Sequence, residues 1–475
     1  MGDSFRRRGI VSAASVAAVV ACTRTPRPQV GPPVVPPGGA VYEEVPPVAT
    51  QAGGGSRSVV VAPPAVQMQR LAPQQIERVV QPFWSPDSAR VMFYDQPAPD
   101  AGGTWSVDVG SGNVQRERSD WGAYLAKGAL LAIPLPNERQ TWVKHLGAGT
   151  EWALPTSGGT VFSPDATLVA FTAAGGLVVA GADGQGAQRL RIPLTGATAL
   201  AWLPGADGTP NARLLVYQAR RGEEAGLWAY HLQTGRLGQL ARGTRIPGYL
   251  LSPDGSWLAH ISMWNGDPNE NGLWITRTDG SFRRRVPLMG SSRWTPDNRL
   301  LVMPARASAA ESHQLWEVHP QTGGIRQLVG PEQAQFRVAN GDWDLSPDGR
   351  QIVFVSADDK GLWRLSVPSL PENARNADGV VPPQVSDPPL TGSGPKPYRL
   401  PFEKAAGPDG WYVSQWYGVT TAGYRWRTSS YGQGQGIHFG VDFAAPMRTP
   451  VVAVAPGRVI AVDGDYGSPP HNMVL

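Results

Sequence analysis

The chain has 475 residues, which is too long for one ordinary domain and predicts two or three. Its formal net charge is only +4, and the 42 basic residues are scattered, so the composition gives no support to a nucleic-acid partner. The single cysteine excludes an intrachain disulfide, and 57 glycines with 46 prolines indicate many turns and some linkers.

Residues 1–22 predict an export signal that ends in a lipid attachment site. Arg6–Arg8 form a positive segment, residues 9–21 are small and apolar, and Val19–Cys22 resembles the lipobox of bacterial lipoprotein signals. The apolar run is too short to span a bilayer. We therefore expect the Cys22 thiol to carry a lipid and to hold the exported chain at the membrane of the cell envelope. A plain signal peptide and an untagged terminus are the alternatives, and a twin-arginine signal is only weakly suggested.

Residues 23–78 are dominated by Pro, Gly, Val and Ala and lack the periodicity needed to bury one face. This composition predicts an extended tether with polyproline II character. Such a tether suits a domain that stands off from a membrane.

Between residues 79 and 367 one motif recurs. Each copy places a Ser-Pro-Asp-Gly-like turn before an apolar run, and a second apolar run, usually with a tryptophan, follows at a similar offset. Proline fixes φ, Asp caps the turn and Gly accepts a positive φ, so the motif predicts a tight turn between two strands. The copies begin at Trp84, Tyr124, Phe162, Trp202, Leu251, Trp294 and Leu345.

A repeat of roughly 40 residues with four short strands per unit predicts a β-propeller, because one unit cannot bury its faces alone. Seven copies predict seven blades, with six as the main alternative. The repeats resemble the WD-like repeats of TolB-type propellers. We expect the repeated Asp and Trp residues to shape turns and fill blade cores rather than to act chemically.

One loop departs from the other copies. Asp267–Gly272 reads D-x-N-x-N-G, the first half of a calcium-binding loop. The glutamate that should close such a loop is absent, because Thr278 holds its position. A plain hairpin loop is therefore the favoured interpretation, and a calcium site is the alternative.

Residues 368–399 return to linker composition, and residues 400–475 contain the one close pair of candidate metal ligands in a recognisable scaffold. His438 and Asp442 form H-x-x-x-D, followed by an Ala-Pro corner and by two runs of Val and Ile that predict a β-hairpin through Pro456-Gly457. An imidazole nitrogen and a carboxylate oxygen are both good Zn²⁺ ligands.

The stretch Gly436–Val459 resembles the lysostaphin/LytM-type zinc endopeptidases, which cut peptide cross-links in bacterial cell walls. The resemblance implies that His438 and Asp442 bind zinc and that peptidoglycan cross-link peptides are the substrate. The family's Tyr-x-His-Leu and His-x-His motifs do not occur in the 475 residues. We therefore expect only the N-terminal part of the peptidase domain, without the third zinc ligand or the catalytic histidines, and no activity.

The expected fold class is all-β, with a seven-bladed β-propeller followed by a partial antiparallel β-sheet peptidase domain. Two functional hypotheses remain. The first is an exported lipoprotein that resembles a zinc-dependent peptidoglycan endopeptidase and uses the propeller as a docking module. The second is a non-catalytic propeller lipoprotein that binds a protein partner or the cell wall.

Overall fold

The computed structural model describes the propeller repeats and parts of the C-terminal region. Cys22, most of the tether and the linker lie outside the described residues. The described ranges are 66–71, 80–95, 103–118, 123–125, 128–135, 139–156, 158–173, 176–205, 207–218, 225–304, 311–368, 400–404, 406–415, 418–419, 437–438, 442–454, 462–466 and 471–474.

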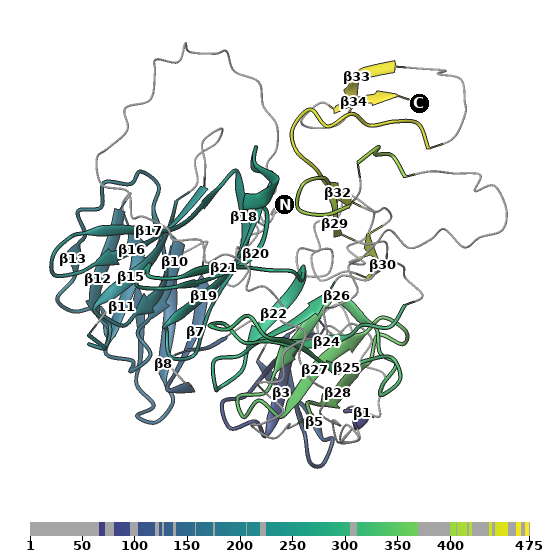
Figure 1. Ribbon diagram of the computed structural model, residues 1–475. Helices are drawn as coiled ribbons and strands as arrows, with labels where there is room; N and C mark the ends of the chain where they lie inside the picture. The colour runs from purple at the N-terminus through teal and green to yellow at the C-terminus, as the bar shows by residue number, and fades with distance from the viewer. Residues whose placement is uncertain are drawn as a thin grey trace, which may run out of the picture.

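Seven four-stranded antiparallel sheets confirm the predicted number of blades (Figure 1). Blade 1 contains β2 (Val80–Trp84), β3 (Arg90–Asp95), β4 (Gly103–Asp108) and β5 (Val114–Arg118). Blade 2 contains β6 (Ala123–Leu125), β7 (Leu130–Leu135), β8 (Gln140–His145) and β9 (Glu151–Leu154). Blade 3 contains β10 (Gly158–Phe162), β11 (Leu168–Ala173), β12 (Gly176–Gly181) and β13 (Gln188–Arg189). Blade 4 contains β14 (Thr198–Leu203), β15 (Arg213–Gln218), β16 (Ala225–His231) and β17 (Leu237–Gly243). Blade 5 contains β18 (Arg245–Leu251), β19 (Trp257–Met263), β20 (Gly272–Arg277) and β21 (Arg283–Val286). Blade 6 contains β22 (Gly290–Trp294), β23 (Leu300–Pro304), β24 (Leu315–Val318) and β25 (Ile325–Val329). Blade 7 contains β26 (Val338–Leu345), β27 (Gln351–Ser356), β28 (Leu362–Ser366) and β1 (Met68–Arg70).

Each blade is a meander whose first strand lies innermost. First strands of neighbouring blades contact one another, as β2 does with β26 and β18 with β22. Successive connections of a meander alternate between its two ends. The turns from the first to the second strand and from the third to the fourth therefore share one face of the ring, here called the turn face. The connections from the second to the third strand lie on the opposite face, the loop face.

The repeated turn is held by its serine as well as by its aspartate. In blade 1 the Ser85 hydroxyl donates to Asp87 Oδ1 at 2.5 Å and accepts from the Arg90 backbone N–H at 2.9 Å. Asp87 Oδ1 also accepts from the Ala89 backbone N–H at 3.0 Å. The same serine-to-aspartate bond recurs at Ser163, Ser252 and Ser346. The turn thus satisfies its own polar groups and lets the next strand begin in register.

The ring is closed by a strand from the N-terminal side of the repeats. β1 pairs antiparallel with β28, with Met68 opposite Leu365 and Arg70 opposite Trp363. Leu71 then donates its backbone N–H to the Leu362 carbonyl at 2.9 Å. The described propeller therefore begins at Met68, inside the segment expected to be tether, rather than at residue 79. Three residues without apolar alternation carry no strand signal in the sequence.

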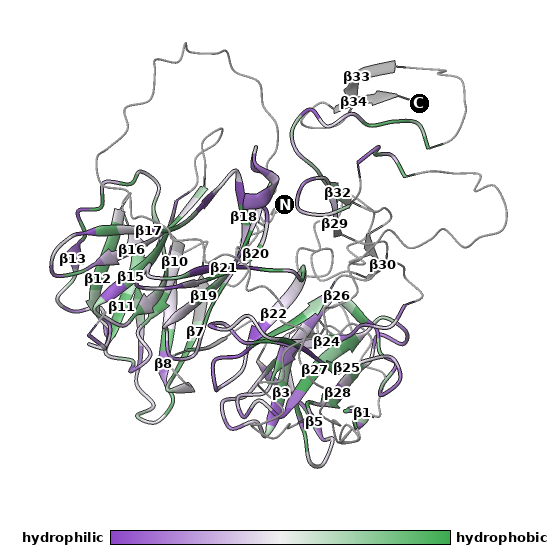
Figure 2. Ribbon diagram, in the orientation of Figure 1, coloured by the Kyte–Doolittle hydropathy of each residue, from purple (hydrophilic) through white to green (hydrophobic). Residues whose placement is uncertain are grey.

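Buried apolar clusters join blades 2 and 3, 3 and 4, 4 and 5, 5 and 6, 6 and 7, and 7 and 1, and the strands that supply them are coloured as hydrophobic in Figure 2. The cluster between blades 7 and 1, for example, contains Leu71, Val91, Phe93 and Val353, each of them buried. The blades are hydrophobic inside and hydrophilic along their turns, as the figure shows. Burial against two neighbours explains why no blade can be stable alone.

The C-terminal region forms three separate two-stranded antiparallel pairs among the described residues, instead of the expected single partial sheet. The pairs are β29 (Tyr412–Gln415) with β32 (Asp442–Ala444), β30 (Gly418–Val419) with β31 (Ile437–His438), and β33 (Val462–Tyr466) with β34 (His471–Val474). Residues 451–454, expected as the first strand of a hairpin, are not in a strand, and Val451 is 73% exposed. Without a partner strand, an exposed run such as residues 451–454 is not stabilised as a β-strand.

Candidate functional site

The structure places the two predicted zinc ligands on different strand pairs. His438 lies on β31 opposite Gly418, and Asp442 lies on β32 opposite Gln415. Their side chains are outside the described part of the chain. Within that part, no three His, Cys, Asp or Glu side chains are grouped to hold a metal ion. Zinc binding by His438 and Asp442 therefore rests on the sequence resemblance alone.

The alternative calcium loop uses its oxygens internally. The segment contains the short 3₁₀ helix η2 (Pro268–Glu270), and Asp267 Oδ1 caps it by accepting from the Asn269 backbone N–H at 2.9 Å. Asn271 Oδ1 accepts from the Asn265 backbone N–H at 2.8 Å. These oxygens face the loop's own N–H groups instead of one shared point, so the loop is a capped connection and not a calcium-binding loop.

A hollow of about 360 Å³ on the turn face is the candidate functional site. It lies where the β20–β21 turn of blade 5 meets the β24–β25 turn of blade 6. Its lining residues are Trp257, Arg277, Asp279, Ser281, Phe282 and Gln321. The volume falls within the range of small-ligand sites, and both polar and aromatic side chains line it.

Arg277 gives the hollow its charge. Its guanidinium lies over the Trp257 ring, with the carbon Cζ 5.0 Å from the ring centroid, and its Nε is 3.5 Å from Asp279 Oδ2. Among the described residues, the two terminal nitrogens of Arg277 have no hydrogen-bond acceptor. Stacking on one face and pairing at Nε fix the plane of the guanidinium. Its outer edge is consequently a preoriented donor fork.

Asp279 is held ionised. Burial acts to raise the pKa of its carboxyl, but hydrogen bonds from the Ser281 hydroxyl and backbone N–H outweigh it. The positive charges of Arg277 and Arg213 act in the same direction, and the pKa of Asp279 lies below its usual range. The carboxylate therefore steadies Arg277 as a charged group.

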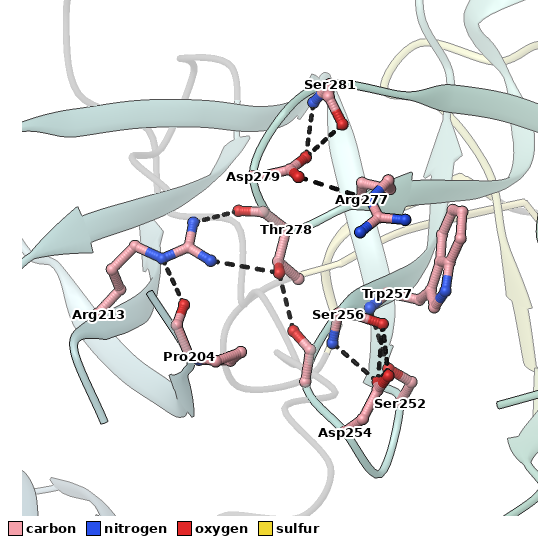
Figure 3. A network of polar contacts seen from close by, with 11 residues as sticks. Pro204, Arg213, Ser252, Asp254, Ser256, Trp257, Arg277, Thr278, Asp279 and Ser281 are labelled. Carbon is pink, nitrogen blue, oxygen red and sulfur yellow. Dashed lines mark hydrogen bonds and ion pairs between the residues drawn. The ribbon is translucent and has the colours of Figure 1, made fainter. Parts of the chain in front are cut away.

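A buried arginine anchors the turn that carries these residues (Figure 3). Arg213 of blade 4 donates from Nε to the Pro204 carbonyl at 2.7 Å and from Nη1 to the Thr278 carbonyl at 2.5 Å. Thr278 in turn donates its hydroxyl to the Gly255 carbonyl at 2.8 Å. Burial lowers the pKa of Arg213, and the Asp279 carboxylate opposes this effect. The network joins blades 4 and 5 and holds the Arg277–Asp279 turn in one position.

Positive charges also lie near Gln321, the blade 6 residue that lines the hollow. His319 Nδ1 accepts backbone N–H bonds from Gln321 at 3.2 Å and Thr322 at 3.3 Å, so its ring proton sits on Nε2. Burial lowers the pKa of His319, and the charges of Arg299 and Arg284 lower it further. The neutral histidine therefore stands in a positive field, which favours an anionic ligand beside Gln321.

The repeat motifs did not predict this hollow, although the sequence contains a signal for it. Three residues after the strand tryptophan, blades 2, 4 and 6 carry His145, His231 and His319, whereas blade 5 carries Arg277. Blades 1, 3 and 7 carry Asp108, Gly181 and Ser366 at that position, so blade 5 is distinguished by its arginine. The predicted lipid site Cys22 lies outside the described residues, among which no helix is long and apolar enough to cross a membrane.

Comparisons with known proteins return fold likenesses only. No family model matches the sequence, and no curated protein matches it. Among solved structures, an oligogalacturonate lyase from Vibrio parahaemolyticus is 11% identical, with a TM-score of 0.47, over 64% of this chain and 94% of that one. TolB from Acinetobacter baumannii is 14% identical, with a TM-score of 0.32, over 63% and 65% of the two chains. A putative TolB from Agrobacterium tumefaciens is 15% identical, with a TM-score of 0.35, over 62% and 99%. Likenesses at this level carry no argument about activity or ligand.

Proposed function

We propose that this chain is a non-catalytic binding protein whose propeller holds a carboxylate-bearing ligand in the hollow between blades 5 and 6. The observation that carries the proposal is the open donor edge of Arg277, fixed by Trp257 and Asp279. A planar guanidinium matches a carboxylate with two parallel hydrogen bonds. Ser281 and Gln321 supply further polar groups in the same hollow.

The lining favours recognition over proton transfer. Asp279 is ionised near neutral pH because its pKa is lowered, so it does not serve as a general acid. The Ser281 hydroxyl donates to Asp279 Oδ1 at 2.6 Å, but the lowered pKa of that carboxyl makes it a poor base for removing the hydroxyl proton. These two groups position the turn and do not form a nucleophile–base pair.

The ligand we propose is the peptide part of peptidoglycan, whose free carboxylates suit Arg277. The export signal ending at Cys22, predicted from the sequence, would bring the propeller to the cell envelope where this polymer lies. The positive charges of Arg284 of blade 5 and Arg299 of blade 6, both of which act on His319, would attract such an anionic chain.

Co-sedimentation of the purified chain with peptidoglycan sacculi tests the proposal. We expect Arg277→Gln to weaken binding about tenfold or more, since a charge-assisted hydrogen bond contributes about 1.5–3 kcal/mol. Arg236→Gln is the matched control, because Arg236 is an exposed arginine of a blade 4 turn on the same face. Failure of the wild-type chain to sediment would reject the wall ligand. Equal binding by the wild type and Arg277→Gln would reject the hollow as its site.

A further inference from the structure

The connection between β19 and β20 contacts the C-terminal region. This connection, Trp264–Asn271, is here called the blade 5 loop. The Trp264 backbone N–H donates to the Pro408 carbonyl at 3.0 Å, and Asn271 Nδ2 donates to Asp409 Oδ1. The rings of Trp264 and Tyr412 lie 6.3 Å apart between centroids. Three contacts of different kinds thus join segments that are far apart in the sequence.

The blade 5 loop is held by hydrogen bonds of its own in addition to its contacts with the C-terminal region. Asn265 accepts the Thr244 backbone N–H at 2.8 Å and donates from Nδ2 to Ser262 Oγ at 2.8 Å and to Asn271 Oδ1 at 2.9 Å. Asn271 is only 1% exposed, so its amide is oriented by these bonds. A satisfied buried network of this kind holds one geometry. The amide donor of Asn271 is therefore aimed at Asp409.

Trp264 adopts a conformation that a bulky side chain rarely takes. Its φ is +60°, in the left-handed region where residues other than glycine are strained. The Arg245 guanidinium lies 4.9 Å from its ring centroid and steadies it. Strain of this type persists where the surrounding structure requires it. Here it places both the backbone N–H and the ring of Trp264 against the C-terminal region.

The contacted residues lead directly into the strands of the candidate zinc site. Tyr412 begins β29, which pairs with β32 so that Gln415 lies opposite Asp442. β30 follows closely and pairs Gly418 with His438 of β31. The placement of β29 and β30 therefore determines where the backbones of their partners Asp442 and His438 lie.

An aromatic cluster stiffens this region. The Trp411 ring stacks on Phe402 with centroids 5.2 Å apart and meets Phe443 edge-on at 5.3 Å. Phe443 belongs to β32, so the cluster ties β32 to the segment that contacts the propeller.

We propose that the blade 5 loop is a built docking site for residues 406–412 of the same chain. Through β29 and β30 it fixes the strands that carry His438 and Asp442 relative to the propeller. The dock lies on the loop face, whereas the hollow lies on the turn face. The dock therefore does not depend on ligand binding in the hollow.

Hydrogen exchange of the full chain, followed by mass spectrometry, tests the dock. Asn271→Asp keeps the acceptor that serves Asn265, removes the donor to Asp409 and sets two carboxylates side by side. We expect exchange in residues 408–415 to accelerate about tenfold or more, and exchange in β19 and β20 to stay unchanged. Asn269→Asp is the matched control, with the same charge change at an exposed position of the same loop. It should leave residues 408–415 at the wild-type rate.

A swapped pair checks that the effect arises at this contact. In the variant with both Asn271→Asp and Asp409→Asn, an amide again faces a carboxylate, and we expect protection of residues 408–415 to return. Wild-type exchange in Asn271→Asp would overturn the dock. Equal acceleration by Asn269→Asp would also overturn it, because the effect would then come from loop charge alone.

Discussion

The indole N–H of Trp84 donates to the Asp344 carbonyl at 3.3 Å, joining the first and the last blade across 260 positions of sequence. The same bond recurs within the ring, from Trp202 to the Val161 carbonyl at 3.0 Å and from Trp294 to the Leu250 carbonyl at 3.1 Å. Trp84 and Trp294 are the last residues of innermost strands and Trp202 is the second-to-last, and each acceptor lies on the innermost strand of the preceding blade. The tryptophan therefore connects neighbouring blades as well as filling space.

Replacement of Trp84 by phenylalanine keeps an aromatic ring and removes the donor. A net hydrogen bond contributes about 0.5–1.5 kcal/mol, and the lost ring volume adds to this. We expect Trp84→Phe to lower the free energy of unfolding by about 1–3 kcal/mol in urea titrations. Trp363→Phe is the control, since Trp363 donates within its own blade to the exposed Asp359 carboxylate at 3.1 Å. An equal loss in both variants would contradict a specific role in joining the blades.

Because β1 closes the ring, we expect a substitution at Leu71 to lower the free energy of unfolding strongly. Its side chain is 4% exposed and packs in the cluster between blades 7 and 1. Leu71→Ala removes buried methyl groups and should lower the free energy of unfolding by about 2–4 kcal/mol. Met68→Ala, at a side chain 40% exposed on the same segment, should cost far less. Similar small costs for the two variants would show that β1 is not needed to close the ring.

The blades were predictable from the sequence because each repeat carries its own turn chemistry. Proline and aspartate mark the turn locally, and the structure confirms the aspartate caps at Asp87, Asp165, Asp254 and Asp348. Each copy of the repeat forms one blade that packs between two neighbours, so the number of copies predicts the number of blades. Local signals of this kind need no knowledge of distant contacts.

The remaining features depend on contacts that no local pattern records. β1 owes its strand conformation to pairing with β28, almost 300 positions later. The hollow arises where turns of two blades meet, so neither turn alone predicts it. The bond between Asn271 and Asp409 spans 138 positions, and the pattern of its loop predicted a plain hairpin, with a calcium site as the alternative, but no contact with a distant segment. Polar residues in a turn have several uses, and their neighbours in space decide which one applies.

The lipid anchor at Cys22 stays a prediction from the signal-like terminus. We expect the chain expressed in a bacterium to fractionate with membranes and Cys22→Ala to be released, because the thiol is the group that accepts the lipid. The measurement is the distribution of the chain between membrane and soluble fractions, with its apparent size. Membrane retention of Cys22→Ala at unchanged size would contradict the anchor.

Zinc binding by His438 and Asp442 also stays a prediction from family resemblance. A catalytic zinc site uses three protein ligands and leaves one position for water. After His438 the 475 residues contain one more histidine, His471, and it lies on a different strand pair. We therefore expect neither tight stoichiometric uptake in calorimetric titration nor release of soluble fragments from sacculi. Tight binding that is lost in His438→Ala would overturn this and support the endopeptidase hypothesis.

The surroundings of Asp344, on an innermost strand, predict an unusual contribution to the pH dependence of stability. It lies on innermost strand β26, where Arg293 Nε donates to Oδ1 at 3.1 Å and the Trp84 backbone N–H donates to Oδ2 at 3.4 Å. Burial raises the pKa of Asp344, and the Arg293 charge with these hydrogen bonds opposes the rise without cancelling it. The folded chain therefore holds this proton to higher pH than the unfolded chain does.

A raised folded pKa makes stability fall as pH rises through that value, because the folded state binds more protons in this window. The window opens near the unfolded aspartate pKa of about 3.9 and extends upward to the folded value. Most other perturbed aspartates have lowered pKa values, as Asp165 does at about 2, and they act in the opposite direction. Comparison with Asp344→Asn, which cannot ionise, cancels those shared contributions. We expect the free energy of unfolding of the wild type, relative to Asp344→Asn, to decrease from about pH 4 upward in parallel urea titrations. A relative increase over the same range would mean that the Arg293 ion pair dominates and that the pKa of Asp344 is lowered.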